Sequence, residues 1–142
     1  MAAVLETVPP LIRDRAVAPT VHASSVRLRR CGSASVVEVC GESDIADAPA
    51  VRDALASAVG DGAGPVIVDL RRSTLVSSAV IATLLNALRR LTRLRRPMVV
   101  VAGPEVERIF RLARLDGTFP LCPDMDSALR RCGSAPCTYM AA

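Results

Sequence analysis

The chain has 142 residues, enough for one domain with a single hydrophobic core. About half of the residues are hydrophobic, 2% are aromatic, the formal net charge is +4 and every basic residue is an arginine. So few aromatic side chains leave nucleic-acid bases almost nothing to stack on, and no nucleic-acid partner is expected. No window of about 18 uncharged apolar residues is present, so no membrane span is expected. Prolines and charges interrupt the N-terminal segment, which does not fit a signal peptide, and we expect a cytoplasmic protein.

Residues 1–23 lack a clear hydrophobic period, and we expect a poorly ordered arm there. Residues 24–132 are predicted to form the folded domain, followed by a tail over residues 133–142. The domain begins with SSVRLRR and SASVVEVCGE on either side of Cys31 and Gly32, a pattern typical of two strands joined by a tight turn. Apolar residues then recur at helical spacing, which predicts a helix of about twelve residues ending near Gly60.

The rest of the domain alternates between strand and helix patterns. PVIVDL and PMVVVAG are short apolar segments that fit strands buried on both faces. The remaining predicted segments are a loop at 71–78, a long helix at 79–96, a helix at 104–117, a short edge strand at 118–122 and a last helix at 123–133. The order β-β-α-β-α-β-α-β-α predicts an α/β fold with a mixed sheet packed by helices. The predicted core includes Val66, Val68, Leu84, Leu88, Val99 and Val101.

Enzymatic and metal-binding motifs find little support in the sequence. The five cysteines form no CxxC pair and His22 is the single histidine, so neither a metal nor a cofactor is expected. An odd number of cysteines also argues against a disulfide framework. GDGAG at residues 60–64 follows a helix and precedes a strand, the reverse of a dinucleotide-binding loop, and is predicted to be a turn. A Ser-His-acid triad needs a histidine near the serine, and His22 lies in the predicted arm. We therefore expect a protein that is not an enzyme.

Polar residues of the long helix gather on one side. Arg89, Arg90, Arg93 and Arg96 fall within one stripe together with Asn86, opposite the leucine-rich face. Two interpretations remain open for this stripe. It is either a solvated helix face or a docking surface for an acidic partner.

Ser77 and Ser78 stand directly before the apolar part of the long helix. Ser77 occupies the position of an N-cap, where its side-chain oxygen can accept the N–H of Ala79 or Val80. A helix N-terminus is also electrostatically favourable for phosphate. Ser77 could therefore be modified without loss of the helix.

Three blocks follow one another within residues 24–131: VVEVCGESDIADAPAVRDAL, VIVDLRRSTLVSSAVIATLL and MVVVAGPEVERIFRLARLDGTFPLCPDMDSAL. In this order they resemble the STAS domain of bacterial anti-sigma factor antagonists. Gly41, Glu42 and Asp44 resemble the family's Gly-Glu-Leu-Asp turn, with Ser43 in place of leucine. Asp69 and Leu70 resemble the Asp-Leu that ends the family's central strand. Ser77 and Ser78 fall on its Asp-Ser-Ser-Gly motif, in which Val76 replaces the aspartate and Ala79 the glycine.

The resemblance implies a protein–protein switch. In the family, the unphosphorylated domain binds an anti-sigma factor, often a serine kinase of the ATPase fold, and so releases a sigma factor. The kinase phosphorylates the first serine of the motif, and the proteins separate. Ser77 matches that serine, and Ser78 is the weaker candidate. The candidate partner surface consists of residues at the turns that the resemblance points to, Asp44, Val76, Ser77 and Ser78, together with those of the polar stripe, Asn86, Arg89, Arg90 and Arg93.

Two other functions stay open. One is a ligand-sensing STAS module that binds a nucleotide or a lipid near the same turn. The other is a small enzyme that uses Ser77.

Overall fold

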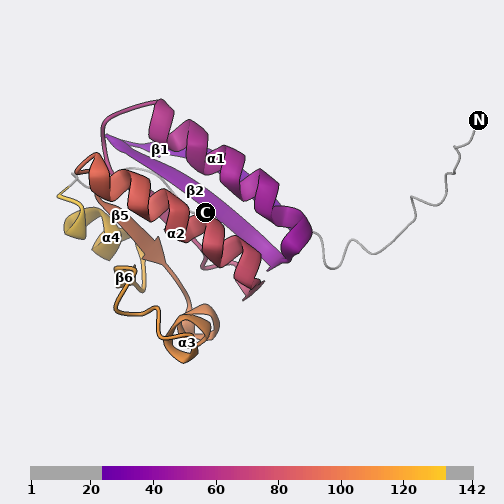
Figure 1. Ribbon diagram of the computed structural model, residues 1–142. Coiled ribbons are helices and arrows are strands. Elements are labelled where there is room, and N and C mark those ends of the chain that lie inside the picture. Colours follow the sequence, from indigo (N-terminus) through magenta and orange to yellow (C-terminus); the bar gives the residue numbers. More distant parts are fainter. Residues whose placement is uncertain (1–23, 134–142) are drawn as a thin grey trace, which may run out of the picture.

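The computed structural model describes residues 24–133 (Figure 1). The predicted arm, with His22, and the predicted tail beyond Gly133 lie outside the described residues. The elements in chain order are β1 Ser25–Cys31, β2 Ala34–Ser43, the 3-10 turn η2 Ile45–Asp47, α1 Ala48–Gly60, β3 Val66–Asp69, β4 Ser73–Val76, α2 Ser78–Arg93, β5 Met98–Val101, α3 Pro104–Leu112, β6 Leu121–Cys122 and α4 Met125–Arg131.

Six strands form one mixed sheet. Five of them run in the order β1-β2-β3-β5-β6, and β4 pairs with β2 outside this path. β1 and β2 are antiparallel, with Leu28 opposite Val37, whereas all other strand pairs are parallel. The predicted α/β fold with a mixed sheet is therefore confirmed.

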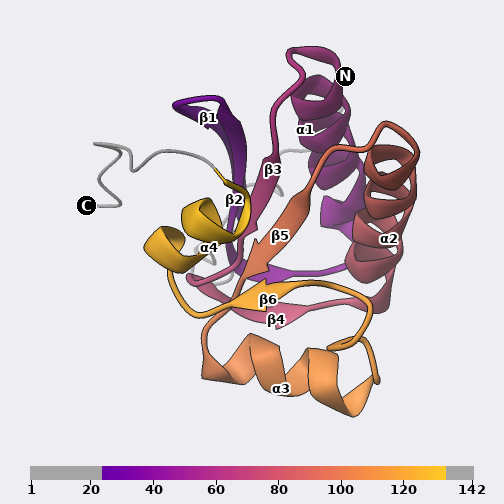
Figure 2. The same ribbon diagram turned by 90° about the vertical axis from the view of Figure 1, so that its left-hand side faces the viewer.

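Helices cover both faces of the sheet (Figure 2). α1 and α2 lie on one face, where Val68 and Leu84 belong to the main hydrophobic core. α4 lies on the other face, where Ile67, Val99 and Leu129 belong to a second core. Successive residues of a strand point to opposite faces, so burial on both faces explains the uninterrupted apolar residues of β5 and of β3 up to Val68.

Two segment predictions are wrong. The segment 71–78, expected to be a loop, contains the strand β4, which pairs with Gly41, Glu42 and Ser43 at the end of β2. The helix expected over 104–117 ends at Leu112, because Arg114 adopts a left-handed conformation with φ of 59°. Such a conformation is incompatible with a continuing right-handed helix.

The structure also differs from expectation at one core residue and at one cysteine. Leu88 is only partly buried, since the fully buried stripe of α2 passes through Val80, Leu84, Ala87 and Leu91 instead. The other five predicted core residues are buried. Cys31 takes part in a disulfide, which the odd number of cysteines did not predict.

Candidate functional site

The residues 76–78, here called the serine turn, are held against the end of β2 by β4. Val76 pairs with Ser43 in the β2–β4 ladder, and the Ser77 N–H donates to the Ser43 carbonyl over 2.9 Å. Asp44 directly follows Ser43 in the chain. The short strand that the sequence did not predict therefore brings Asp44 and the serine turn to the same end of the sheet.

Ser77 is the N-cap of α2, as predicted. Its backbone is extended, with φ of −73° and ψ of 163°, and its Oγ accepts the Val80 N–H over 3.3 Å. Its side chain is half-buried, whereas Ser78, the first residue of the helix, is exposed. The two adjacent serines thus differ: one satisfies a backbone donor, and the other points its side chain to solvent.

The start of α2 is electrostatically suited to an anion. The helix has 16 residues and no acidic side chain in its first turn. The aligned peptide dipoles leave partial positive charge at this end, where no carboxylate of the helix itself neutralises it. A phosphate on the Ser77 Oγ would lie at this end of the helix.

Asp44 is exposed but already engaged in local hydrogen bonds. Its carboxylate accepts the Ala46 N–H over 2.9 Å, and its own N–H donates to the Asp47 carboxylate over 2.8 Å, forming a capping box around η2. The Ser24 hydroxyl and the Asp44 N–H bind the Asp47 carboxylate and lower its pKa. These bonds fix the turn that follows β2 next to Ser77.

Ser43 is fully buried beside the serine turn. Its Oγ is the only buried side-chain oxygen or nitrogen in the described part of the chain without a hydrogen-bond partner. Burial of a hydroxyl without a partner costs about 1–3 kcal/mol. The packing beneath the serine turn is therefore not optimised for stability.

Apolar side chains at the serine turn divide between core and surface. Val76 is only 4% exposed and belongs to the main core, so its side chain offers little surface to a partner in this structure. Leu75 and Ile45, in contrast, are 47% and 75% exposed. Sequence reasoning missed both. Recognition of β4 would have found Leu75, because strand alternation places it on the face opposite Val76.

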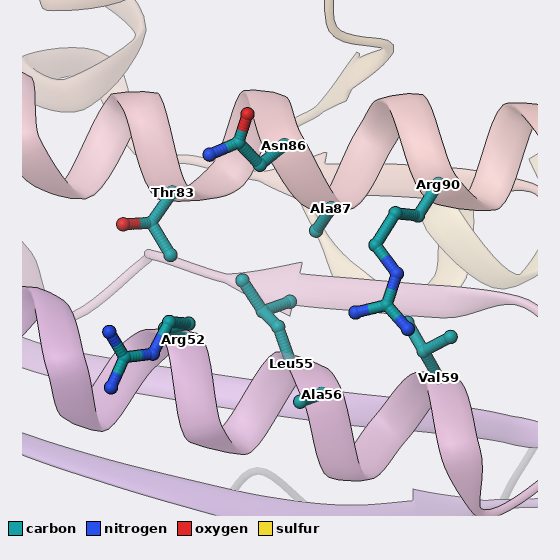
Figure 3. A pocket seen from close by; sticks show the side chains of 8 residues that line it. All are labelled: Arg52, Leu55, Ala56, Val59, Thr83, Asn86, Ala87 and Arg90. Atoms are coloured by element: carbon teal, nitrogen blue, oxygen red, sulfur yellow. The ribbon is translucent and has the colours of Figure 1, made fainter.

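The residues of the predicted arginine stripe do not share one environment. Arg89 and Arg93 are exposed on α2. Asn86 and Arg90 are also exposed, and they line a hollow between α2 and α1 (Figure 3). Asn86 follows Ser77 by nine residues and Arg93 follows it by 16, or about 14 and 24 Å along the helix, so the stripe covers the C-terminal half of α2 and the serine turn lies at the other end.

Arg96 does not belong to the stripe, contrary to prediction. Arg95 adopts a left-handed conformation with φ of 58°, which ends the helical course of the chain. The guanidinium of Arg96 then donates to the carbonyls of Val59 and Gly64, over 2.6 and 2.9 Å. Arg96 therefore caps the end of α1 and fixes the turn before β3.

Asp69, at the end of the central strand, holds a neighbouring arginine. Its buried carboxylate accepts the Arg71 Nε–H over 3.0 Å and an Arg71 terminal N–H over 2.8 Å. The Arg71 backbone N–H donates to the same carboxylate over 3.1 Å. Asp69 thus shapes the turn between β3 and β4, which positions the strand leading to the serine turn.

Comparison with known proteins identifies the family of this fold. The family model described as "Mlab, STAS domain" matches residues 26–123, more than half of the chain. The chain belongs to the STAS-domain family. A comparison with curated protein sequences gives no match.

Three solved structures of anti-sigma factor antagonists are similar to this chain. An anti-sigma factor antagonist from Mycobacterium paratuberculosis is 31% identical with a TM-score of 0.72, and the match covers 82% of this chain and 98% of that one. The unphosphorylated anti-sigma factor antagonist SpoIIAA is 16% identical, with a TM-score of 0.64 and coverage of 78% and 99%. The phosphorylated form of the Bacillus cell fate determinant SpoIIAA is 17% identical, with a TM-score of 0.58 and coverage of 75% and 98%. The two SpoIIAA matches show a common fold. The match to the Mycobacterium paratuberculosis protein, together with the family model, confirms the resemblance to STAS-domain anti-sigma factor antagonists.

The STAS domain offers no metal cluster within residues 24–133, where no three His, Cys, Asp or Glu side chains gather in a suitable arrangement. No helix in the same residues is long and apolar enough to cross a membrane. The chemistry of its candidate site consists of a capping serine, an exposed serine and two exposed apolar side chains around a helix N-terminus.

Proposed function

We propose that this protein is an anti-sigma factor antagonist and no enzyme. Its STAS domain binds an anti-sigma factor of the ATPase and serine-kinase fold, and so releases a sigma factor in the cytoplasm. The serine turn, with Asp44, is the centre of the binding surface. Phosphorylation of Ser77 switches the interaction off. The observation that carries this proposal is the position of Ser77, which caps α2 beside exposed apolar side chains.

The unmodified serine turn suits burial under a partner. Leu75 directly precedes the turn, and Ile45 follows two residues after Ser43, which pairs with Val76. Both side chains expose apolar surface that would gain stabilisation by leaving water. Ser77 adds no charge, and its Oγ already has the Val80 N–H as a partner. A partner could therefore cover the turn without the large cost of desolvating a charged group.

Phosphorylation changes this balance without requiring the domain to unfold. A phosphate adds about −1.5 to −2 charges at neutral pH. The N-terminus of α2 accommodates that charge in the free protein, where water still solvates the outer phosphate oxygens. A partner that covers Leu75 and Ile45 would have to remove this water, and burial of an unpaired charge is strongly unfavourable. We therefore expect the phosphorylated form to keep its fold and lose affinity.

The test is a kinase assay with the anti-sigma factor and ATP, phosphosite mapping, and binding titrations of variants. Ser77→Ala should lose about 1 kcal/mol of stability through the missing cap but bind within about threefold of the unaltered protein. Ser77→Glu should bind at least about tenfold more weakly. Ser57→Glu, at an exposed position of α1, changes the charge equally and should leave affinity unchanged.

Two results would contradict the proposal. If Ser77→Glu binds as tightly as Ser57→Glu, the charge at the turn does not control the interaction. If phosphate is found on Ser78 and none on Ser77, the exposed serine is the switch and Ser77 is only a helix cap.

A further inference from the structure

α1 and α2 lie side by side on one face of the sheet (Figure 1). A shallow groove lies between them (Figure 3). Its floor is apolar and closed, since Leu55, Val59 and Ala87 are 2%, 7% and 6% exposed. Ala56 widens the groove on the α1 side, because its small side chain leaves space where a larger one would project. The groove therefore offers apolar contact to an occupant without exposing the main core.

Two arginines stand at opposite ends of this apolar floor. Figure 3 shows Arg52 of α1 at one end and Arg90 of α2 at the other. Arg52 has only a long, exposed contact of 3.5 Å with its neighbour Asp53, and an ion pair of that kind contributes little. The guanidinium of Arg90 forms no hydrogen bond or ion pair within residues 24–133, and α2 contains no acidic residue. Both charges are available to an acidic occupant.

The spacing of the charges indicates the shape of the occupant. Arg52 lies across the groove from Thr83, and Val59 lies across from Arg90 (Figure 3). Arg52 and Val59 are seven residues apart in α1, and Thr83 and Arg90 are seven residues apart in α2. At the helical rise of about 1.5 Å per residue, the two arginines are therefore separated by about 10 Å along the helix axes. A third helix laid along the groove would present residues i, i+3, i+4 and i+7 on one face. Acidic residues at i and i+7, with apolar residues between them, match the two arginines and the floor.

We propose that the groove docks an acidic amphipathic helix of a partner protein, with carboxylates seven residues apart bound to Arg52 and Arg90. A small amphiphile with one anionic head would use only one of the two charged ends. Along α2 the groove extends from Thr83, six residues or about 9 Å after Ser77, to Arg90, 13 residues or about 20 Å after Ser77. The groove therefore lies beyond the serine turn, and its test with a peptide needs no anti-sigma factor and does not depend on the function proposed above.

The probe is a synthetic helical peptide with Glu at positions i and i+7 and Leu at i+3 and i+4. A control peptide has the same composition, but its two glutamates lie on the opposite face. Titration of the full chain by fluorescence anisotropy measures affinity, and NMR chemical-shift changes locate the binding site. The first peptide should bind at least about tenfold more tightly than the control, and increasing salt should weaken it. The largest shifts should fall on Leu55, Ala56 and Ala87.

Three variants separate charge from shape. Arg52→Glu and Arg90→Glu should each reduce peptide affinity by about tenfold or more, because each leaves one carboxylate facing a like charge. Arg108→Glu, at an exposed position of α3, makes the same change in net charge and should alter affinity by less than about twofold. Ala56→Phe fills the groove without a charge change and should abolish binding.

The proposal is overturned if both peptides bind equally, or if Arg108→Glu weakens binding as much as Arg90→Glu does, since either result means attraction to net charge alone. It is also overturned if dodecanoate shifts the groove resonances and the acidic peptide does not. Circular dichroism of each variant verifies that the comparison is made between folded proteins.

Discussion

Replacement of Arg96 by alanine should destabilise the domain far more than replacement of Arg93, although Arg93 is the last residue of α2 and Arg96 follows only three positions later. Arg96 donates to the carbonyls of Ala58, Val59 and Gly64, over 3.3, 2.6 and 2.9 Å. A hydrogen bond from a charged group contributes about 1.5–3 kcal/mol, but water can reach part of this turn and replace some of the loss. We therefore expect a total cost of about 2–3 kcal/mol, since the three bonds are not additive.

Arg93 is the matched control for this experiment. Its side chain is exposed and forms no hydrogen bond or ion pair within residues 24–133. Its loss should cost no more than about 0.5 kcal/mol, mainly through its attraction to the C-terminal end of the helix dipole. Arg96→Lys should lie between the two alanine variants, because an ammonium group keeps the charge but cannot span three carbonyls with a planar fork.

Urea unfolding followed by circular dichroism gives the required free energies. Urea is preferable to guanidinium chloride because the latter screens charge. With slopes of about 1–3 kcal/mol per molar urea, a cost of 2 kcal/mol lowers the midpoint by about 0.7–2 M. If Arg96→Ala and Arg93→Ala have midpoints that agree within error, the contacts of Arg96 with the end of α1 do not stabilise the fold and the reasoning is refuted.

Three further predictions concern the core, a close backbone contact and acid stability. Leu84→Ala removes a fully buried side chain and should cost about 2–5 kcal/mol in the same assay; a cost near zero would contradict the packing of α2. Gly64→Ala places a Cβ 1.9 Å from a backbone oxygen and should destabilise by more than about 2 kcal/mol, whereas Gly60→Ala, with nothing within 4 Å, should be neutral or stabilising. In the folded state the pKa of Asp47 is lowered from its usual 3.8. The ionised Asp47 side chain therefore stabilises the protein above pH 3.8, and this contribution is lost as the pH falls through the lower pKa of the folded state. Unfolding free energies measured from pH 6 to pH 2 should therefore decrease below about pH 4, and less steeply in Asp47→Ala; equal slopes would contradict this assignment.

The parts of the fold that sequence could predict are those set by local periodicity. The apolar runs of β3 and β5 and the helical spacing of α2 report burial directly, because each residue's environment follows from its position in one element. The Ser77 cap is also local, since donor and acceptor are three residues apart. The switch role of Ser77 came from the family resemblance, because a hydrophobic pattern carries no information about phosphorylation.

The parts that sequence could not predict depend on contacts distant in the chain. β4 has four residues, too few for a clear period, and becomes a strand because it pairs with Ser43 and its neighbours some 30 positions earlier. The exposure of Leu75 follows from that pairing. Arg96 leaves the arginine stripe because Arg95 turns into a left-handed conformation, which helical projection does not anticipate.

The pairing of β4 with β2 also protects the protein from a hazard of open sheets. β1 pairs with β2 as far as Cys40 and β3 as far as Glu38, and among the described strands it is β4 that pairs with Gly41–Ser43. If the segment before α2 were shortened, this end of β2 would become a free edge, ready to add a strand from another molecule. The strand β4, which leads into the serine turn, therefore also covers the end of β2, and the length of this segment is constrained by resistance to aggregation as well as by the fit of any partner.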